Sequence, residues 1–375
     1  MFNRKLGVFV CVVVLSSILI VYLSESAWFS SLLVLVEFPP APPVAAGSTV
    51  SSSLVEILGC NLSLIMSDRV KFKSLVSWSK EKVLSITNCS LDKIDVTFAQ
   101  TCLRSSSKRN GIQLIGDSVT RYQYLNLVYF LATGNWTSDP SQPNECEAQY
   151  SSWNEFYSVT NERMQGHEIC DCSRNPGETI IENRYFQMEE LLVTYRQLFS
   201  PSYPILAHNT TLLNISSCAT HCQQAFCAPG QCGPATADNM SFAITPGSLS
   251  ALINAHTARD VFINAGIWWN SYGRNTVEDF AEIWKNELAR VKPSHRVHWK
   301  MTTATQLAWG PEYGFVDSMV ADGHLFSVFD TYALTFPLFE QGLLAEAMWD
   351  VFHFFPPIYV GLNQALLGYL CTLPD

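Results

Sequence analysis

The hydrophobic pattern is clearest where a short apolar run, Ile112 to Ile115, ends at Gly116 and apolar residues then recur at helical spacing from Val119. This pattern predicts a buried strand, a turn and a helix. Ser118 would lie in that turn, at the carboxyl end of the strand and beside helix N-terminal N–H groups that favour negative charge. The turn therefore suits a nucleophilic hydroxyl, although Asp117 or Ser118, taken alone, would more readily be interpreted as a helix cap.

A second patterned region predicts a strand, a helix and another strand. The apolar run from Asp260 to Asn264 is the first strand, and apolar residues share one face of a helix from about Thr276 to Val291. Pro293 ends this helix, and Arg296 to Thr303 forms the next strand. Such a strand-helix-strand unit predicts an α/β fold with a parallel sheet and covering helices.

Between these regions the pattern is irregular. The segment from Thr133 to about Pro246 is rich in Gly, Pro and Cys. We interpret it as long insertions over the edge of the sheet, with short strands such as Glu190 to Tyr195. A substrate groove is expected there, because binding residues concentrate on loops held by a rigid scaffold.

The N-terminal pattern predicts a membrane segment. Residues Gly7 to Leu23 form an apolar run of 17 residues after Arg4 and Lys5, which reaches the short end of the range that spans a bilayer. The flanking positive charges favour a signal-anchor with residues 1–6 in the cytosol. The alternative is a cleaved signal peptide, because the residues from Leu23 to Ala27 form an acceptable cleavage site. We expect a Pro/Ser-rich stalk at 24–53 and a lumenal domain at 54–375.

Composition fits this organisation. The chain has 375 residues, 48% hydrophobic and 15% charged, which is enough for one large domain of about 300 residues or two smaller ones. The formal net charge of −10 gives no electrostatic support for binding nucleic acid or anionic lipid.

Cysteines and glycosylation motifs support a lumenal location. Of 12 cysteines, 11 lie outside the predicted anchor, where disulfides are favoured. Four of them share one loop with His221, and we prefer disulfides to a zinc site there. These four are Cys218, Cys222, Cys227 and Cys232. The odd number of lumenal cysteines implies a free or intermolecular thiol. Six Asn-x-Ser/Thr motifs begin at Asn61, Asn88, Asn135, Asn209, Asn214 and Asn239.

Three separated stretches together carry candidate chemistry. The strand that ends at Asn264, with Gly266 beyond it, brings a possible oxyanion donor to the sheet edge where ligands bind. Asp350 and His353 are three residues apart, so they would share one face of a helical turn. Among the other histidines we single out only His324, for the nearby Asp322, but residues two apart do not share a helical face.

These blocks resemble those of the SGNH (GDSL-type) hydrolase superfamily. The stretches from Gly116 to Gln123 and from Asp260 to Trp269 are most similar to the PC-esterase group, which includes the plant trichome birefringence-like glycan O-acetyltransferases. The likeness runs from Gln113 to Phe355 and is carried by short blocks. The chain departs from the plant members at Ile267, where they usually have histidine, and at 354–357, where Phe-Phe-Pro-Pro replaces a Cys-rich, Trp-containing setting.

The resemblance implies an SGNH-like three-layer α/β domain with a Ser118, His353 and Asp350 triad. The oxyanion hole would use the Ser118 N–H group and the Asn264 amide. Residues expected to contact substrate are Arg121, Gln123 and Trp268. Arg121 and Gln123 could instead make solvent-facing polar contacts, and Trp268 and Trp269 could belong to the core.

The implied activity is O-acetyl transfer to a glycan in the Golgi lumen. An acetyl donor would serve as co-substrate, with no bound cofactor and no metal. Two alternatives stay open, namely a carbohydrate or lipid esterase with the same triad and an inactive glycan-binding protein. A secreted location is the alternative to the Golgi membrane.

Overall fold

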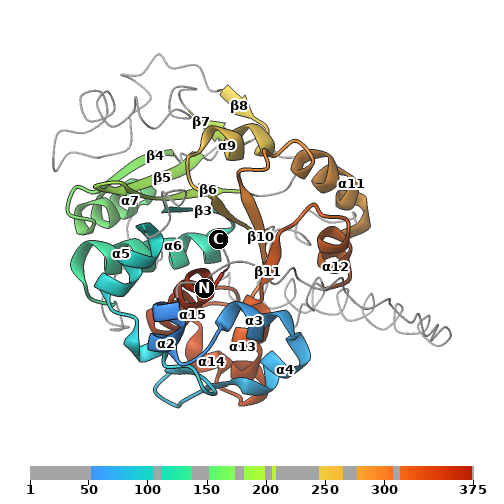
Figure 1. The fold of residues 1–375 in the computed structure, drawn as a ribbon. Coiled ribbons are helices and arrows are strands. Elements are labelled where there is room, and N and C mark those ends of the chain that lie inside the picture. Colours follow the sequence, from blue (N-terminus) through green and yellow to red (C-terminus); the bar gives the residue numbers. More distant parts are fainter. Residues whose placement is uncertain are drawn as a thin grey trace, which may run out of the picture. The chain divides into compact units, whose positions relative to one another are not determined.

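A seven-stranded sheet organises the part of the chain described by the computed structural model, which comprises residues 52–104, 111–136, 152–173, 181–198, 205–207, 245–264, 277–306 and 313–373 (Figure 1). The strand order is β11-β10-β9-β3-β6-β5-β4. Strands β11 to β6 in that order are parallel to their neighbours, whereas β5 and β4 pair antiparallel. Their bounds are β3 Gly111–Gly116, β4 Glu168–Ser173, β5 Ile181–Met188, β6 Leu191–Gln197, β9 Asp260–Ile263, β10 Arg296–Lys300 and β11 Ser327–Phe329.

Helices cover both faces of this sheet. Side chains alternate between the faces of a strand, so Ile112 and Leu114 of β3 pack in one hydrophobic cluster and Ile115 packs in the other. The first face is covered by α5 Val96–Arg104, α6 Ser118–Thr133, α7 Trp153–Arg163, α13 Thr331–Glu340 and α15 Pro356–Cys371. The second is covered by α9 Leu249–Ala255, α11 Val277–Leu288 and α12 Tyr313–Ala321. This arrangement is a three-layer α/β fold, as the sequence predicted.

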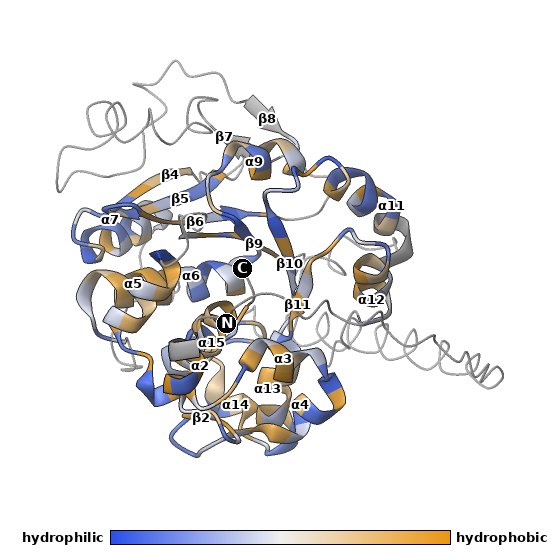
Figure 2. Ribbon diagram, in the orientation of Figure 1, coloured by the Kyte–Doolittle hydropathy of each residue, from blue (hydrophilic) through white to orange (hydrophobic). Residues whose placement is uncertain are grey.

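Smaller elements pack beside α13 and α15. Figure 2 shows these two helices largely in the hydrophobic colour, and most of the α15 side chains are buried. Apolar residues of α3 and of the β1-β2 hairpin belong to the same cluster as α15. The remaining elements are α2 Ser52–Leu58, α3 Leu62–Ser67, α4 Arg69–Leu75, β1 Val76–Trp78, β2 Leu84–Ile86, η1 Leu91–Lys93, β7 Ile205–Ala207, β8 Thr245–Gly247 and α14 Leu344–Ala347.

The predicted strand-helix and strand-helix-strand units are confirmed. The strand at 112–115 and its following helix are β3 and α6, and the unit from Asp260 is β9, α11 and β10. β9 and β10 are parallel neighbours. β10 ends at Lys300 rather than Thr303, and α11 ends at Leu288 rather than Val291.

The interpretation of 133–246 as insertions over the sheet edge is wrong for β4, β5 and β6. These strands are part of the main sheet, and β6 lies directly beside β3. The short strand predicted from Glu190 to Tyr195 is present as β6. The pattern of β4 and β5 was hidden because Glu168, Glu182 and Arg184 are buried in ion pairs where apolar residues are expected. Buried charges become tolerable when they are paired, so the strands look polar in sequence.

Three disulfides confirm part of the cysteine prediction. They join Cys60 to Cys89, Cys102 to Cys371 and Cys170 to Cys172. The loop from Cys218 to Cys232 lies outside the described residues, as do the predicted anchor at 7–23 and the stalk up to residue 51. Within the described ranges, no helix combines the length and the apolar composition that crossing a bilayer requires.

Candidate functional site

Ser118 lies where the sequence placed it, in the turn between β3 and α6. It is the first residue of α6, and Asp117 is the N-cap, whose carboxylate accepts a hydrogen bond from the Thr120 N–H group at 2.9 Å. A Cβ atom on Gly116 would come within 2.6 Å of the Thr120 hydroxyl oxygen and 3.2 Å of the Asn264 Cβ atom. Gly116 therefore allows the tight turn, while Asp117 rather than Ser118 carries out the capping.

This turn lies at a switch in strand order. After β3, the chain first builds the sheet on one side of β3, where β6 lies directly beside it. It then builds the sheet on the other side, where β9 lies directly beside β3. The carboxyl ends of these three parallel strands point the same way. In open α/β sheets, ligands bind in the crevice at such a point. The topology thus supports a binding site around Ser118 independently of any motif.

The structure brings Ser118, His353 and Asp350 together. The Ser118 hydroxyl oxygen is 2.6 Å from His353 Nε2, although the two residues are 235 positions apart in the chain. His353 Nδ1 is 2.7 Å from Asp350 Oδ2. Because the carboxylate can only accept, Nδ1 carries the proton and Nε2 is left to accept from the serine hydroxyl. These contacts form a hydrogen-bonded triad of serine, histidine and aspartate.

Asp350 is held by the backbone of its own turn. Its Oδ1 atom accepts hydrogen bonds from the N–H groups of Phe352 and His353, each at 2.7 Å. Burial alone would raise the pKa of Asp350, but hydrogen bonds from His353 and from these N–H groups lower it below the ordinary value. The carboxylate therefore stays ionised and fixed in direction.

The predicted helical turn at 350–353 is wrong, although the predicted contact is present. These residues form bends enclosed by an isolated bridge between Met348 and Phe354. The three-residue spacing works because the Asp350 side chain accepts hydrogen bonds from the backbone N–H groups of Phe352 and His353, which is a common local alternative to a helix.

Two aromatic side chains hold the His353 ring. The Trp349 ring is stacked on it, with centroids 4.9 Å apart and planes at 13°. The Tyr122 ring meets it edge-on, with centroids 5.2 Å apart and planes at 86°. The sequence analysis missed both contacts. Tyr122 is four residues after Ser118 on α6 and so shares its face, a signal that could have identified it.

Asn264 lies beside the turn but is not oriented as expected. Its Nδ2 atom donates to the Lys300 carbonyl at 2.8 Å and lies 3.5 Å from the Thr302 hydroxyl. Its Oδ1 atom has no hydrogen-bond partner among the described residues. The amide nitrogen expected in the oxyanion hole is therefore occupied by the neighbouring strand. Exchanging the amide atoms would set two carbonyl oxygens against each other, so this orientation is chemically required.

Arg121 is not exposed, which contradicts the alternative of solvent-facing contacts. Its guanidinium lies in the domain interior, 3.1 Å from Glu182 and 2.8 Å from the Tyr122 hydroxyl. Glu182 also pairs with Arg184, which pairs in turn with Glu168. This buried chain of charges joins α6 to β5 and β4, so it favours a structural role for Arg121 over the expected contact with substrate.

Gln123 is also fully buried, so the solvent-facing alternative is wrong for it as well. Its side-chain amide has no hydrogen-bond partner among the described residues. The backbone carbonyl of Gln123 accepts a hydrogen bond from the Asn363 side chain of α15 at 3.0 Å, which links α6 to α15. Gly266, Ile267, Trp268 and Trp269 lie outside the described residues.

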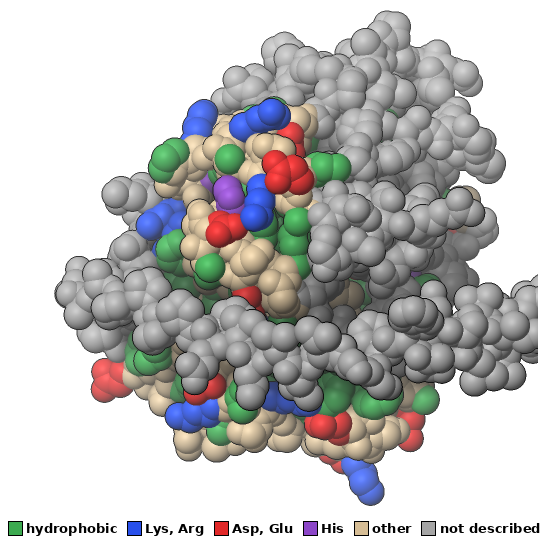
Figure 3. All heavy atoms as spheres, turned by 90° about the vertical axis from the view of Figure 1, so that its right-hand side faces the viewer, with side chains coloured by type: hydrophobic (Ala, Val, Ile, Leu, Met, Phe, Trp, Pro, Cys, Tyr) green, Lys and Arg blue, Asp and Glu red, His purple; other side chains and the backbone are tan. Residues whose placement is uncertain are grey.

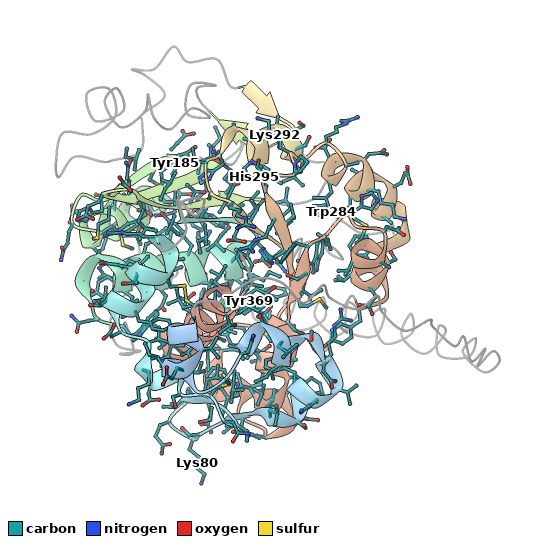
Figure 4. The ribbon with its side chains drawn as sticks, viewed as in Figure 1. Lys80, Tyr185, Trp284, Lys292, His295 and Tyr369 are labelled. Atoms are coloured by element: carbon teal, nitrogen blue, oxygen red, sulfur yellow. A yellow bond between two sulfur atoms is a disulfide. The ribbon has the colours of Figure 1, made fainter. Side chains whose placement is uncertain are left out.

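A second serine, histidine and aspartate contact lies at the amino ends of the strands. His298 Nδ1 is 2.7 Å from the Ser327 hydroxyl and its Nε2 is 2.9 Å from Asp260. Arg296 binds both carboxylate oxygens of Asp260, at 2.7 and 3.0 Å. Tyr369, labelled in Figure 4, approaches Ser327 from α15. Here the serine lacks a helix N-terminus and the carboxylate is neutralised, so we interpret the cluster as structural.

The described residues contain no group of three or more His, Cys, Asp or Glu side chains that could hold a metal ion. Basic and acidic side chains are interspersed on the described part of the face in Figure 3, rather than separated by sign. Comparisons of the chain with protein-family models, curated proteins and solved structures found no match.

Proposed function

We propose that this protein is a membrane-anchored O-acetyltransferase that moves an acetyl group to a glycan hydroxyl through an acyl-enzyme on Ser118. The observation that carries the proposal is the hydrogen-bonded triad of Ser118, His353 and Asp350, with heavy-atom distances of 2.6 and 2.7 Å. Its place at the end of β3 and the start of α6 supports an SGNH-like fold, in keeping with the three blocks that resemble that superfamily.

The first half-reaction acylates the serine. His353 Nε2 takes the hydroxyl proton of Ser118 while the serine oxygen attacks the acetyl carbonyl of the donor. The carbonyl electron pair moves to oxygen, and the N–H groups at the start of α6 favour that charge. When the carbonyl re-forms, the donor's leaving group departs with the proton from His353. Asp350 stabilises the imidazolium that exists between these steps.

The second half-reaction transfers the acetyl group. A sugar hydroxyl gives its proton to His353 and attacks the acetyl-serine, and the proton then returns to the Ser118 oxygen as that bond breaks. With water in place of the sugar, the same steps would produce acetate. The choice of transfer over hydrolysis rests on the likeness to the glycan O-acetyltransferases and on the predicted anchor, which would hold the domain in the Golgi lumen beside glycans.

A serine-directed phosphonate probe tests the nucleophile on the full-length protein in detergent. We expect the wild-type chain to be labelled and Ser118→Ala to lose labelling. The matched control is Ser327→Ala, because Ser327 also contacts a histidine that contacts an aspartate. Labelling that persists in Ser118→Ala, or that is lost in Ser327→Ala, would place the nucleophile elsewhere.

A product assay tests the reaction. The full-length protein is incubated with an acetyl-ester donor and candidate oligosaccharides, and acetylated sugar is measured against free acetate. Acetylated sugar that depends on Ser118 supports the transferase. Acetate alone would favour the esterase, and sugar binding without either product would favour an inactive glycan-binding protein.

A further inference from the structure

Two carboxamide side chains flank Gly116 at the carboxyl end of β3. On one side, Gln197 of β6 is the register partner of Gly116. On the other side, Asn264 follows β9, and its backbone N–H group donates a hydrogen bond to the Ile115 backbone carbonyl at 2.8 Å. The turn that carries Ser118 thus begins between a glutamine and an asparagine.

Gln197 is on the face of the sheet from which α6 starts. Tyr195, two residues earlier on β6, packs in the same hydrophobic cluster as Ile112 and Leu114 of β3. Its hydroxyl donates to the carbonyl groups of Gly116 at 3.2 Å and Asp117 at 3.0 Å. Because residues two apart in a strand share a face, the Gln197 side chain lies on this same face, one step nearer the end of the strand.

The Gln197 amide is buried without a partner. The residue is 7% exposed, and within the described part of the chain neither Nε2 nor Oε1 makes a hydrogen bond. A buried amide normally pairs, because leaving it unpaired forfeits its hydration. By contrast, the Asn264 nitrogen on the other side of the turn already has two acceptors for its two hydrogens, the Lys300 carbonyl at 2.8 Å and the Thr302 hydroxyl at 3.5 Å. Gln197 therefore has the free donor that Asn264 lacks.

We propose that the Gln197 amide is a catalytic hydrogen-bond donor, which binds the acyl carbonyl oxygen of the substrate and strengthens its contact as that oxygen becomes negative. This inference rests on the proposed acyl transfer. Gln197 would act together with the Ser118 backbone N–H group, on the side of the turn opposite Asn264. Donors aimed at a developing oxyanion stabilise the transition state more than the ground state.

An unpaired buried amide does not by itself make a glutamine a candidate donor at the site, as Gln113 shows. Gln113 of β3 is also fully buried, and its amide makes no hydrogen bond with any described residue. However, it lies one residue from Ile112 and Leu114, so it faces the opposite side of the sheet, with Ile115. Gln113 is therefore a matched control with the same side chain and a similarly buried amide, but on the face of the sheet away from the turn.

The experiment compares Gln197→Met and Gln113→Met in the full-length protein. Methionine keeps the volume of glutamine and removes the donor. For Gln197→Met we expect kcat for acetyl transfer to fall about 10²- to 10³-fold, as for the loss of one oxyanion donor, with KM nearly unchanged. Gln113→Met should keep wild-type kcat. Neither variant should have a lower melting temperature, because no described hydrogen bond is removed.

The outcomes separate this inference from the proposed function. If wild type transfers acetyl and Gln197→Met does so within about threefold of it, the inference is wrong and the function stands. A fall in kcat accompanied by a lower melting temperature, matched in Gln113→Met, would indicate a structural role and overturn it too. If wild type neither reacts with the serine probe nor transfers acetyl, the proposed function fails and the inference fails with it.

Discussion

The indole ring of Trp349 lies parallel to the imidazole ring of His353, with ring centroids 4.9 Å apart. Trp349 directly precedes Asp350, so one short turn supplies the candidate base, the carboxylate that orients it and the aromatic surface on which it rests. An aromatic face attracts a nearby cation. The stack should therefore favour the imidazolium that the proposed half-reactions require, as well as fix the angle of the ring.

Replacing Trp349 by leucine should reduce acetyl transfer without abolishing it. An aromatic pair contributes about 0.5–1.5 kcal/mol beyond its buried area, so we expect kcat to fall roughly two- to tenfold. The control is Trp136→Leu, which removes the stack of Trp136 on Phe130, with centroids 3.6 Å apart, at the other end of α6. That variant should lose stability but retain kcat. Equal losses of kcat in both variants would contradict a specific role for Trp349.

Asp350→Asn should be far more damaging. The amide can present its nitrogen to His353 Nδ1 and so favour the wrong tautomer, which in serine proteases lowers kcat about 10⁴-fold. Steady-state kinetics would measure the loss, and circular dichroism would verify folding. Asp322→Asn is the comparison, because Asp322 forms a salt bridge with Lys285 at the surface, at 2.8 Å. Such pairs are worth about 0–1 kcal/mol, so its kinetics should match wild type.

Asp260 should make the stability of the fold depend on acid pH. Burial alone would raise its pKa, but hydrogen bonds from His298 and Arg296 lower it far below the ordinary value. A carboxyl group with a depressed folded pKa stabilises the protein fully above its unfolded pKa of about 3.9. That contribution is lost as the pH falls through the range between the unfolded and folded pKa values.

Urea unfolding between pH 3 and 7 would measure this effect. Asp260→Asn should be about 3–5 kcal/mol less stable at pH 7, because the buried Arg296 guanidinium loses the carboxylate that it binds through two hydrogen bonds. The difference between the variant and wild type should narrow towards pH 3. A gap that is constant over this range would mean that Asp260 does not titrate with folding.

The disulfides should differ in their contribution to stability. Cys102 to Cys371 joins α5 to α15 across 269 residues, whereas Cys170 to Cys172 spans two residues within β4. A longer closed loop restricts the unfolded chain more. We expect Cys102→Ser with Cys371→Ser to cost about 2–5 kcal/mol of unfolding free energy in chemical denaturation, and the paired serine variant of Cys170 and Cys172 to cost less. The reverse order would contradict this account.

The strands that the sequence predicted correctly are those whose buried side chains are mostly apolar. Ile112 to Ile115 and Val261 to Ile263 are buried on both faces of the sheet, and apart from Gln113 they are apolar, so they give nearly continuous apolar runs of the kind expected for inner parallel strands. β5 and β4 could not be found in this way. Glu182 and Arg184 are as buried as those residues, but their burial depends on pairing with each other and with Glu168 and Arg121. Sequence periodicity does not reveal such pairing.

Some residues of the candidate site could likewise be predicted from the sequence, and others could not. Ser118, Asp350 and His353 were identified from local spacing and block order, and the structure brings them together. The orientation of Asn264 could not be predicted, because it depends on the Lys300 carbonyl of the next strand. Gln197 was missed because its strand was interpreted as an insertion. Contacts between strands require a register, and the sequence pattern alone does not give one.

The distance along the chain between Ser118 and His353 has a consequence during synthesis. The last strand of the main sheet, β11, ends at Phe329, so a growing polypeptide can complete the sheet before residue 353 has left the ribosome. Such an intermediate would contain the serine but no base to activate it. The protein should therefore stay chemically silent through most of its translation and become reactive only when the segment carrying the imidazole docks beside α6.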